Sequence, residues 1–215
     1  QELWKFDGEQ VELVEAGFVA KSETSLGGFT EFQGSLYFRG DNGVSGEELY
    51  RFDGDSVSLV ADLQTGAGSS SPVGLTVHED ALYFSAQIGD SFSNLMRYDG
   101  SKVTQVAGFD NPRFSVVMGS SFAGDLYFGA DDGIHGMELW KYDGERAALV
   151  SDISPGNSAS FPRDFTPVGD KLAFRATTPE VGQEIFQFDG ESVSLLVDTN
   201  PGPRSSDSGY LTEHE

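Results

Sequence analysis

Acidic side chains recur at fixed positions along this sequence, and they are the residues best able to bind a ligand or move a proton. One carboxylate precedes a short apolar segment in four copies of a common pattern, as Glu2, Glu48, Glu138 and Glu184, with Asn94 in a fifth copy. Acceptor atoms at this position could fasten the backbone N–H groups of a neighbouring loop, which would explain the repetition. A ring of ligand sites is the alternative interpretation.

A second acidic set consists of aspartates that follow an aromatic residue and precede glycine. Its members are Asp7, Asp53, Asp99, Asp143 and Asp189. Asp before Gly is typical of a tight turn between two strands, because Asp bonds its own backbone and Gly accepts positive φ. Turn formation is therefore sufficient to explain this set.

Two glycine-containing loops carry clustered oxygen ligands, Asp41-Asn42-Gly43 and Asp131-Asp132-Gly133. Calcium prefers such oxygen atoms, so Asp41, Asn42, Asp131 and Asp132 are candidate calcium ligands. Neither loop has the spaced acidic pattern or the bidentate Glu of an EF-hand loop. Solvated loop carboxylates are the favoured interpretation of both loops.

The remaining residue types indicate no catalytic centre. His78, His135 and His214 occupy different places in the repeat, so neither a shared metal site nor a histidine-based triad is supported. The absence of cysteine excludes disulfides, cysteine-ligated zinc and thiol nucleophiles. We therefore expect a protein that is not an enzyme, with no catalytic residue and with calcium as the only cofactor to consider.

An internal repeat of 44 to 46 residues organises the chain. Its first marker is an aromatic residue followed by Asp-Gly, at 6–8, 52–54, 98–100, 142–144 and 188–190. A second marker, LYF or LAF, keeps the same spacing at 36–38, 82–84, 126–128 and 172–174. Because both markers hold one register along the whole chain, the repeat is not a chance similarity.

Each repeat predicts four antiparallel strands. Asp-Gly between two short apolar runs indicates one hairpin, and the segment around LYF indicates a second. Segments rich in Pro, Gly and Ser, such as 152–162, predict crossovers to the next repeat. No segment has helical periodicity. The sequence thus predicts an all-β fold, a β-propeller of four-stranded antiparallel blades that forms a single domain over residues 1–215.

Blade closure is the irregular part of this pattern. The chain starts in the third strand of one repeat and ends in a first strand near 209–213. We expect five blades, with an incomplete closing blade or one shared with a partner; a segment of a longer repeat array is the alternative. The apolar strand positions predict a core that includes Trp4, Leu36, Phe38, Phe84, Leu126, Phe128, Leu139, Trp140 and Phe174.

The net charge limits the partners. Thirteen Lys and Arg against thirty-five Asp and Glu give a net charge of −22. A nucleic acid or an anionic bilayer would be repelled along most approaches, so we expect neither nucleic acid binding nor membrane insertion. No stretch of the sequence reaches the roughly 18 apolar residues of a membrane helix.

The segments GMELWKYDG (136–144) and LVSDISPG (149–156) closely resemble the bacterial ELWxxDGT repeat family. The resemblance continues through QELWKFDG, GEELYRFDG and GQEIFQFDG and covers essentially the whole chain. The chain departs from the family after Asp-Gly, where Glu9, Asp55, Ser101, Glu145 and Glu191 stand in place of Thr. The resemblance implies a secreted or cell-surface repeat module, and it carries over no catalytic residue.

Taken together, these features lead us to expect a non-enzymatic extracellular or cell-surface module with a structural or adhesive role, self-assembling through open strand edges or binding surface glycans. Arg39-Gly40-Asp41 spells a tripeptide that some adhesion receptors read. A lectin-like carbohydrate-binding propeller is the first alternative, and a glycosidase with carboxylates at the propeller axis is the second.

Overall fold

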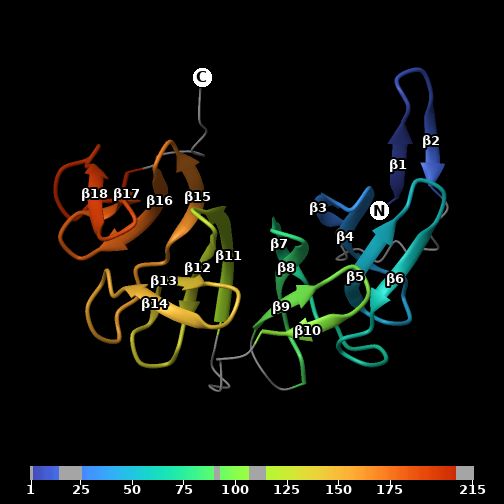
Figure 1. The fold of residues 1–215 in the computed structure, drawn as a ribbon, viewed down its shortest axis with the longest axis horizontal. Coiled ribbons are helices and arrows are strands. Elements are labelled where there is room, and N and C mark those ends of the chain that lie inside the picture. Colours follow the sequence, from blue (N-terminus) through green and yellow to red (C-terminus); the bar gives the residue numbers. More distant parts are fainter. Residues whose placement is uncertain (1, 15–25, 90–92, 107–114, 207–215) are drawn as a thin grey trace. The chain divides into compact units, whose positions relative to one another are not determined.

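The computed structural model describes residues 2–14, 26–89, 93–106 and 115–206. These residues form strands and no helix (Figure 1), and none of them belongs to a helix able to cross a membrane. The strands are β1 (Leu3–Phe6), β2 (Val11–Val14), β3 (Gly27–Phe32), β4 (Ser35–Asp41), β5 (Glu47–Phe52), β6 (Val57–Ala61), β7 (Val73–His78), β8 (Ala81–Ala86), β9 (Asn94–Tyr98), β10 (Val103–Gln105), β11 (Ser115–Phe122), β12 (Asp125–Asp131), β13 (Met137–Tyr142), β14 (Ala147–Ser151), β15 (Arg163–Val168), β16 (Lys171–Thr178), β17 (Gly182–Phe188) and β18 (Val193–Val197).

The strands pair in sequence order into four four-stranded antiparallel sheets and one two-stranded hairpin. The sheets are β3 to β6, β7 to β10, β11 to β14 and β15 to β18, and β1 pairs with β2. Four strands per repeat, in the order in which the sequence presents them, are as predicted. The predicted last strand at 209–213 lies outside the described residues, as does His214.

The Asp-Gly groups form the hairpin turns that the sequence predicts. At the turn from β5 to β6, Asp53 Oδ1 accepts hydrogen bonds from the backbone N–H groups of Asp55 (3.1 Å) and Ser56 (2.9 Å). These bonds are the main reason that the pKa of Asp53 lies below its usual range. Gly54 takes φ of 104°, a value that only glycine adopts at little cost. The same two backbone bonds recur at Asp7, Asp99, Asp143 and Asp189.

The chain divides into two compact units, 1–105 and 106–215, and each is described by itself. In the first unit the sheet β3–β6 packs against the sheet β7–β10, and Tyr37 and Leu49 meet Leu82, Phe84 and Met96. Fully burying one such side chain contributes about 1.5–3 kcal/mol. The core of that unit therefore lies between successive sheets, as face-to-face blades require.

The second unit repeats this packing with its own residues. The sheet β11–β14 places Tyr127 and Leu139 against Leu172, Phe174 and Phe186 of the sheet β15–β18. In both units, therefore, the face of one sheet that carries the Tyr of its LYF strand packs on the face of the next sheet that carries the Leu and Phe of its LYF or LAF strand.

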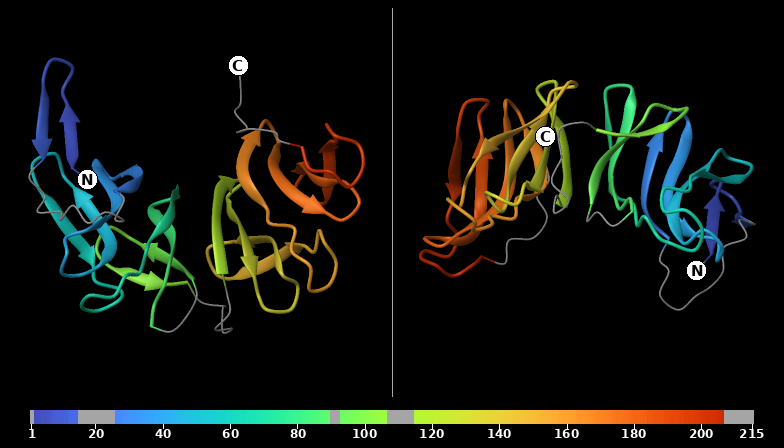
Figure 2. Two further views of the ribbon diagram at one scale, coloured as in Figure 1. Left: turned by 180° about the vertical axis from the view of Figure 1, so that it is seen from behind. Right: turned by 90° about the horizontal axis from the view of Figure 1, so that it is seen from below.

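Most of the predicted core is confirmed. Six of the nine side chains are fully buried, namely Phe38, Phe84, Leu126, Phe128, Leu139 and Phe174. The prediction that Trp4 belongs to the core is wrong, because 53% of its surface is exposed. Leu36 and Trp140 are only partly buried. Trp4 lies on β1, and among the described residues the β1–β2 sheet has two strands whereas each other sheet has four. The hairpin is the dark-blue pair of strands in Figure 2. This hairpin packs on the sheet β3–β6 through Leu3 and Val14, which meet Phe38 and Tyr50.

Candidate functional site

Glu48 is fully buried and fastens the crossover that follows its sheet. Its Oε2 accepts the backbone N–H of Leu63 (3.2 Å) and the hydroxyl of Ser70. Its Oε1 accepts the backbone N–H groups of Gln64 (3.2 Å) and Ser70 (3.1 Å). Both carboxylate oxygens are therefore used inside the protein, as the loop-fastening interpretation predicts.

Glu138 repeats this arrangement in the second unit and is also fully buried. It accepts the backbone N–H groups of Ile153 (2.8 Å), Ser154 (3.3 Å) and Ser160 (3.0 Å), and the Ser160 hydroxyl at 2.7 Å. The bonds span the same sequence separations as those of Glu48. The structure thus favours the structural role of these glutamates over a ring of ligand sites.

Burial and hydrogen bonding compete in setting the pKa values of these carboxyls. Burial dominates at Glu48 and Glu138 and raises the pKa of both, against the hydrogen bonds that favour the ionised form. At Glu184 burial also acts to raise the pKa, but bonds from Thr199 and Ser206 together outweigh it and lower the pKa. The three equivalent glutamates therefore respond to pH in two opposite ways.

For two members of the repeated set, Glu2 and Asn94, the crossover that follows lies largely outside the described residues, within 15–25 and 107–114. Glu2 is exposed at the start of the β1–β2 hairpin. Asn94, which replaces the glutamate in the sheet β7–β10, accepts a hydrogen bond from the side-chain amide of Gln105 at 3.0 Å. The four-bond pattern is therefore established at Glu48 and Glu138.

Sequence reasoning missed the glycines that cooperate with these glutamates. Gly46, Gly136 and Gly182 stand two residues before the buried glutamates and have φ of 67°, 71° and 68°. A Cβ at Gly136 would lie 2.4 Å from the carbonyl oxygen of Ser158, and one at Gly46 would lie 2.0 Å from that of Gly68. The signal was present as Gly-x-Glu in three repeats, and the copy with Asn94 has Phe92 at the glycine position.

The candidate calcium ligands of the first loop bind their own backbone. Asp41 Oδ1 accepts the N–H of Gly43 at 2.6 Å, and Asn42 Oδ1 accepts the N–H groups of Val44 and Ser45, each at 2.9 Å. Asp41 also ends β4 and is buried, so the Arg-Gly-Asp tripeptide lies in a strand rather than on a free loop.

The second loop is built in the same way and adds a histidine. Asp131 Oδ1 accepts the N–H of Gly133 at 2.7 Å, and Asp132 Oδ1 accepts those of Ile134 and His135, each at 2.9 Å. Asp132 Oδ2 lies 2.8 Å from Nδ1 of His135. Within the described ranges, no three His, Asp or Glu side chains gather as a metal site. Calcium binding at Asp41, Asn42, Asp131 and Asp132 stays a prediction.

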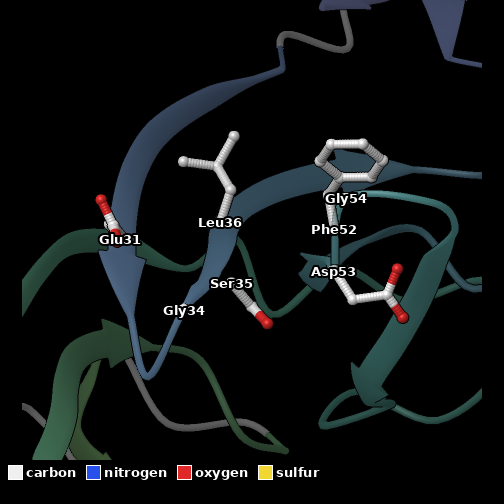
Figure 3. Close-up of a pocket in the computed structure, with 7 residues that line it drawn as sticks. All are labelled: Glu31, Gly34, Ser35, Leu36, Phe52, Asp53 and Gly54. Atoms are coloured by element: carbon white, nitrogen blue, oxygen red, sulfur yellow. The ribbon is translucent and has the colours of Figure 1, made fainter.

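The sheet β3–β6 carries a cleft of about 290 Å³ at the end where its two hairpin turns lie (Figure 3). It is lined by Glu31, Gly34, Ser35, Leu36, Phe52, Asp53 and Gly54. Leu36 pairs with Glu31 on β3 and with Phe52 on β5, so the three side chains form one row across the sheet. Leu36 and Phe52 give the cleft an apolar floor.

Two of the polar side chains of this cleft are engaged in hydrogen bonds of the sheet and its turn. Ser35 accepts a hydrogen bond from Arg51 Nε at 2.9 Å, and Asp53 holds the hairpin turn. Glu31 is exposed at the rim. The lining thus has two carboxylates, Glu31 and Asp53, and one hydroxyl, Ser35. The cleft can take an apolar group with a neutral or positive neighbour.

No family model and no curated protein matches the chain. Solved structures do match. The β-propeller domain of the Trilobed protease from Pyrococcus furiosus is 15% identical, with a TM-score of 0.59 over 92% of this chain and 62% of that one. TolB from Acinetobacter baumannii is 13% identical, with a TM-score of 0.56 over 95% of this chain and 50% of that one.

A third match is an acylaminoacyl peptidase in complex with Z-Gly-Gly-Phe-chloromethyl ketone. It is 14% identical, with a TM-score of 0.56 over 80% of this chain and 27% of that one. The chain therefore spans less than two thirds of the length of each of these proteins. Together with the four-stranded antiparallel sheets, these similarities show that the fold is that of a β-propeller.

These findings correct the functional expectation drawn from the sequence. The structural neighbours are peptidases, puromycin hydrolases and TolB, and nothing in them or in the structure supports adhesion. The expectation of a structural or adhesive, self-assembling module, with its carbohydrate-binding and glycosidase alternatives, is wrong, whereas the extracellular or cell-surface location stays a prediction. The ring of ligand sites also loses its physical basis, because Glu48 and Glu138 use their oxygens to hold the crossovers, and Asp41 of the Arg-Gly-Asp tripeptide is buried.

Proposed function

We propose that this chain is a non-catalytic β-propeller domain that holds a segment of polypeptide on behalf of a larger protein or complex. The cleft in the sheet β3–β6 carries the proposal. Its apolar floor of Leu36 and Phe52 is accessible, and its polar groups Ser35 and Asp53 are engaged in hydrogen bonds within the sheet and its turn. Proteins of similar fold include a peptidase solved with a peptide-derived chloromethyl ketone, and polypeptide is the ligand class that we carry over.

The charge of the chain sets the character of this polypeptide. Glu31 and Asp53 stand at the cleft within a chain of net charge −22. An acidic segment would be repelled, whereas a neutral or basic segment would be attracted over the range of the screened field. The preferred ligand therefore has an apolar or aromatic anchor with neutral or basic neighbours, and the affinity falls as salt is raised.

The test measures binding and turnover on the same peptides. Fluorescently labelled peptides with an apolar anchor and either basic or acidic flanks are titrated with the full chain by anisotropy, and the same peptides are followed by mass for cleavage. We expect saturable binding of the basic set, weaker binding of the acidic set and intact peptides throughout.

A variant of the cleft floor and a matched surface variant complete this test. Leu36→Gln should weaken binding, because it places an amide on the apolar floor, while Val168→Gln, at an exposed position of the other unit, should not. Cleavage that persists in Leu36→Gln, or binding that ignores Leu36, would contradict the proposal.

A further inference from the structure

The loop that follows β4 contains Asn42-Gly43, and Asn42 is the only asparagine of the chain that precedes a glycine. An asparagine in this place can lose its side-chain amide without an enzyme, because glycine has no side chain to hinder attack by its backbone nitrogen. The Gly43 nitrogen gives up its proton and bonds to Cγ of Asn42, and the Cγ–Nδ2 bond breaks as ammonia leaves with a proton. Water then opens the resulting succinimide ring and leaves aspartate or isoaspartate at position 42.

The nitrogen that must attack is held by the preceding aspartate. The Gly43 N–H donates to Oδ1 of Asp41 at 2.6 Å, a short bond to a carboxylate. Removing this proton would place a second negative charge beside the first, which like-charge repulsion opposes. Asp41 is only 7% exposed at the end of β4, so its carboxylate is fixed in place. The attacking atom is therefore withheld for as long as the loop stays closed.

The carbon that must be attacked is held as well. Asn42 Oδ1 accepts the backbone N–H groups of Val44 and Ser45, each at 2.9 Å. The hydroxyl of Tyr50, a residue that is 3% exposed, hydrogen-bonds the backbone of Asn42. Ring closure sets χ1, χ2 and ψ of Asn42 anew, so both bonds to Oδ1 are given up on the way to the succinimide. Each of these lost bonds makes the reaction in the closed loop slower.

The second unit shows how the fold holds an aspartate at this place. Asp132 stands at the equivalent position, and its Oδ1 accepts two backbone N–H groups at 2.9 Å each, as Asn42 Oδ1 does. Asp131 accepts the N–H of Gly133 at 2.7 Å. Gly43 and Gly133 have φ of 79° and 78°, so the two loops share one backbone conformation at the glycine. An aspartate at position 42 can therefore make the bonds that Asn42 makes.

We propose that Asn42 is a site of spontaneous deamidation that is gated by opening of its loop, and that Asp41 is the residue that keeps the loop closed. The amide is retained in the closed loop and is lost in the open loop at the rate of a free peptide, so the observed rate is the peptide rate multiplied by the open fraction. The aspartate product is held as Asp132 is. The isoaspartate product lengthens the backbone by one methylene and displaces the donors of the turn. Asn42 does not line the cleft, so this inference is independent of the proposed function.

The experiment compares the rate of ammonia loss at Asn42 in the full chain with the rate in a capped peptide of residues 39–46, RGDNGVSG. Both are kept in the same mildly alkaline buffer without calcium, and peptide mapping by mass assigns each conversion to its position. We expect the folded chain to react at least about tenfold more slowly than the peptide, because opening breaks a charge-assisted hydrogen bond. The chain denatured in urea should react at the rate of the peptide.

Three variants identify the gate. Asp41→Ala removes the acceptor of the Gly43 N–H and should raise the rate at Asn42 at least about tenfold. Asp131→Ala removes the equivalent acceptor from the loop of the other unit and is the matched control, so it should leave the rate at Asn42 unchanged. Asp41→Asn keeps an acceptor oxygen and loses only the charge, so it should give a smaller rise. If Asp41→Ala does not fold, Asp41→Asn decides.

Several results would overturn the inference. One is a folded chain that reacts as fast as the peptide, and another is a folded Asp41 variant that reacts at the wild-type rate. A third is equal slowing of Asn157 against its own peptide, because Asn157 is exposed in a crossover and protection would then be general to the folded chain. Asn42→Asp should keep the urea midpoint of the wild-type chain, and a large fall would contradict the claim that the fold accepts the product.

Discussion

Replacing Glu138 by glutamine tests whether the buried carboxylates hold the crossovers, because glutamine keeps the shape and gives up one acceptor oxygen. Glu138 accepts four hydrogen bonds, two on each oxygen. Two survive on the amide oxygen, and the other two donors then face an NH₂ group. Hydrogen bonds to charged groups contribute about 1.5–3 kcal/mol each. Ser160 can turn its hydroxyl, and glutamine relieves the burial of a charge, so we use the lower limit for each of the two lost bonds. The free energy of unfolding should therefore fall by about 3 kcal/mol.

Such a loss is large against a typical domain stability of about 5–15 kcal/mol. Urea unfolding of the full chain carrying Trp4→Phe measures it, because Trp140 then reports on the unit that contains Glu138. Glu145→Gln in the exposed hairpin turn is the matched control and should change stability by less than about 0.5 kcal/mol. If Glu138→Gln proves as mild as this control, the fastening role assigned to the carboxylate is refuted.

The same pair of proteins has a pH dependence of defined sign. Burial raises the pKa of Glu138 above its ordinary value of 4.5, so the folded state takes up a proton before the unfolded state as pH falls. The stability from this group is present below the unfolded pKa and is lost as pH rises through the folded pKa. The deficit of Glu138→Gln should therefore be larger near pH 4.5 than at pH 8. Glu184, whose pKa is lowered, should give the opposite trend.

Three further predictions concern the turns and loops. Asp143→Ala should lower the urea midpoint, because it removes both bonds to the turn backbone, while Asp143→Asn keeps the acceptor and should stay near the wild type in the same titration. Gly136→Ala should lower the free energy of unfolding by at least about 2 kcal/mol, measured in urea, since φ is 71° and the new Cβ would meet a carbonyl oxygen. Gly156→Ala, with φ of 92° and open space around it, should lower it less. Equal losses would contradict the packing argument. In an NMR titration the pKa of His135 should lie above 6.5, because its hydrogen bond to Asp132 favours the charged ring. Asp132→Asn should return this pKa toward 6.5. Any stability that the pair adds is present below pH 6.5 and is lost as pH rises through the folded pKa.

The sheets could be predicted from the sequence because the repeat specifies each of them locally. Asp-Gly marks each hairpin, and a large apolar side chain returns at one register position of each LYF or LAF strand, as Phe38, Phe84, Phe128 and Phe174. The fastening role of Glu48 could be predicted for the same reason, since a polar group that recurs with the architecture is best explained by the architecture.

The cleft could not be predicted from the sequence, because no special residue creates it. Leu36 and Phe52 are of the same types as their buried counterparts, and their exposure depends on which strand covers them. Trp4 was misplaced for that reason, since its own repeat contributes only two described strands. The one local signal was Glu31, a charge at a position where two other copies have Val77 and Pro167.

Amide hydrogen exchange at Leu63 and Ile153 tests most directly whether the repeated carboxylates serve the fold. The two N–H groups lie at the start of the crossovers and are bonded to Glu48 and Glu138 respectively. The account predicts protection close to that of the neighbouring strand amides, and its loss at Ile153 alone in Glu138→Gln. Exchange of both amides at the rate of an open loop in the wild-type protein would contradict it.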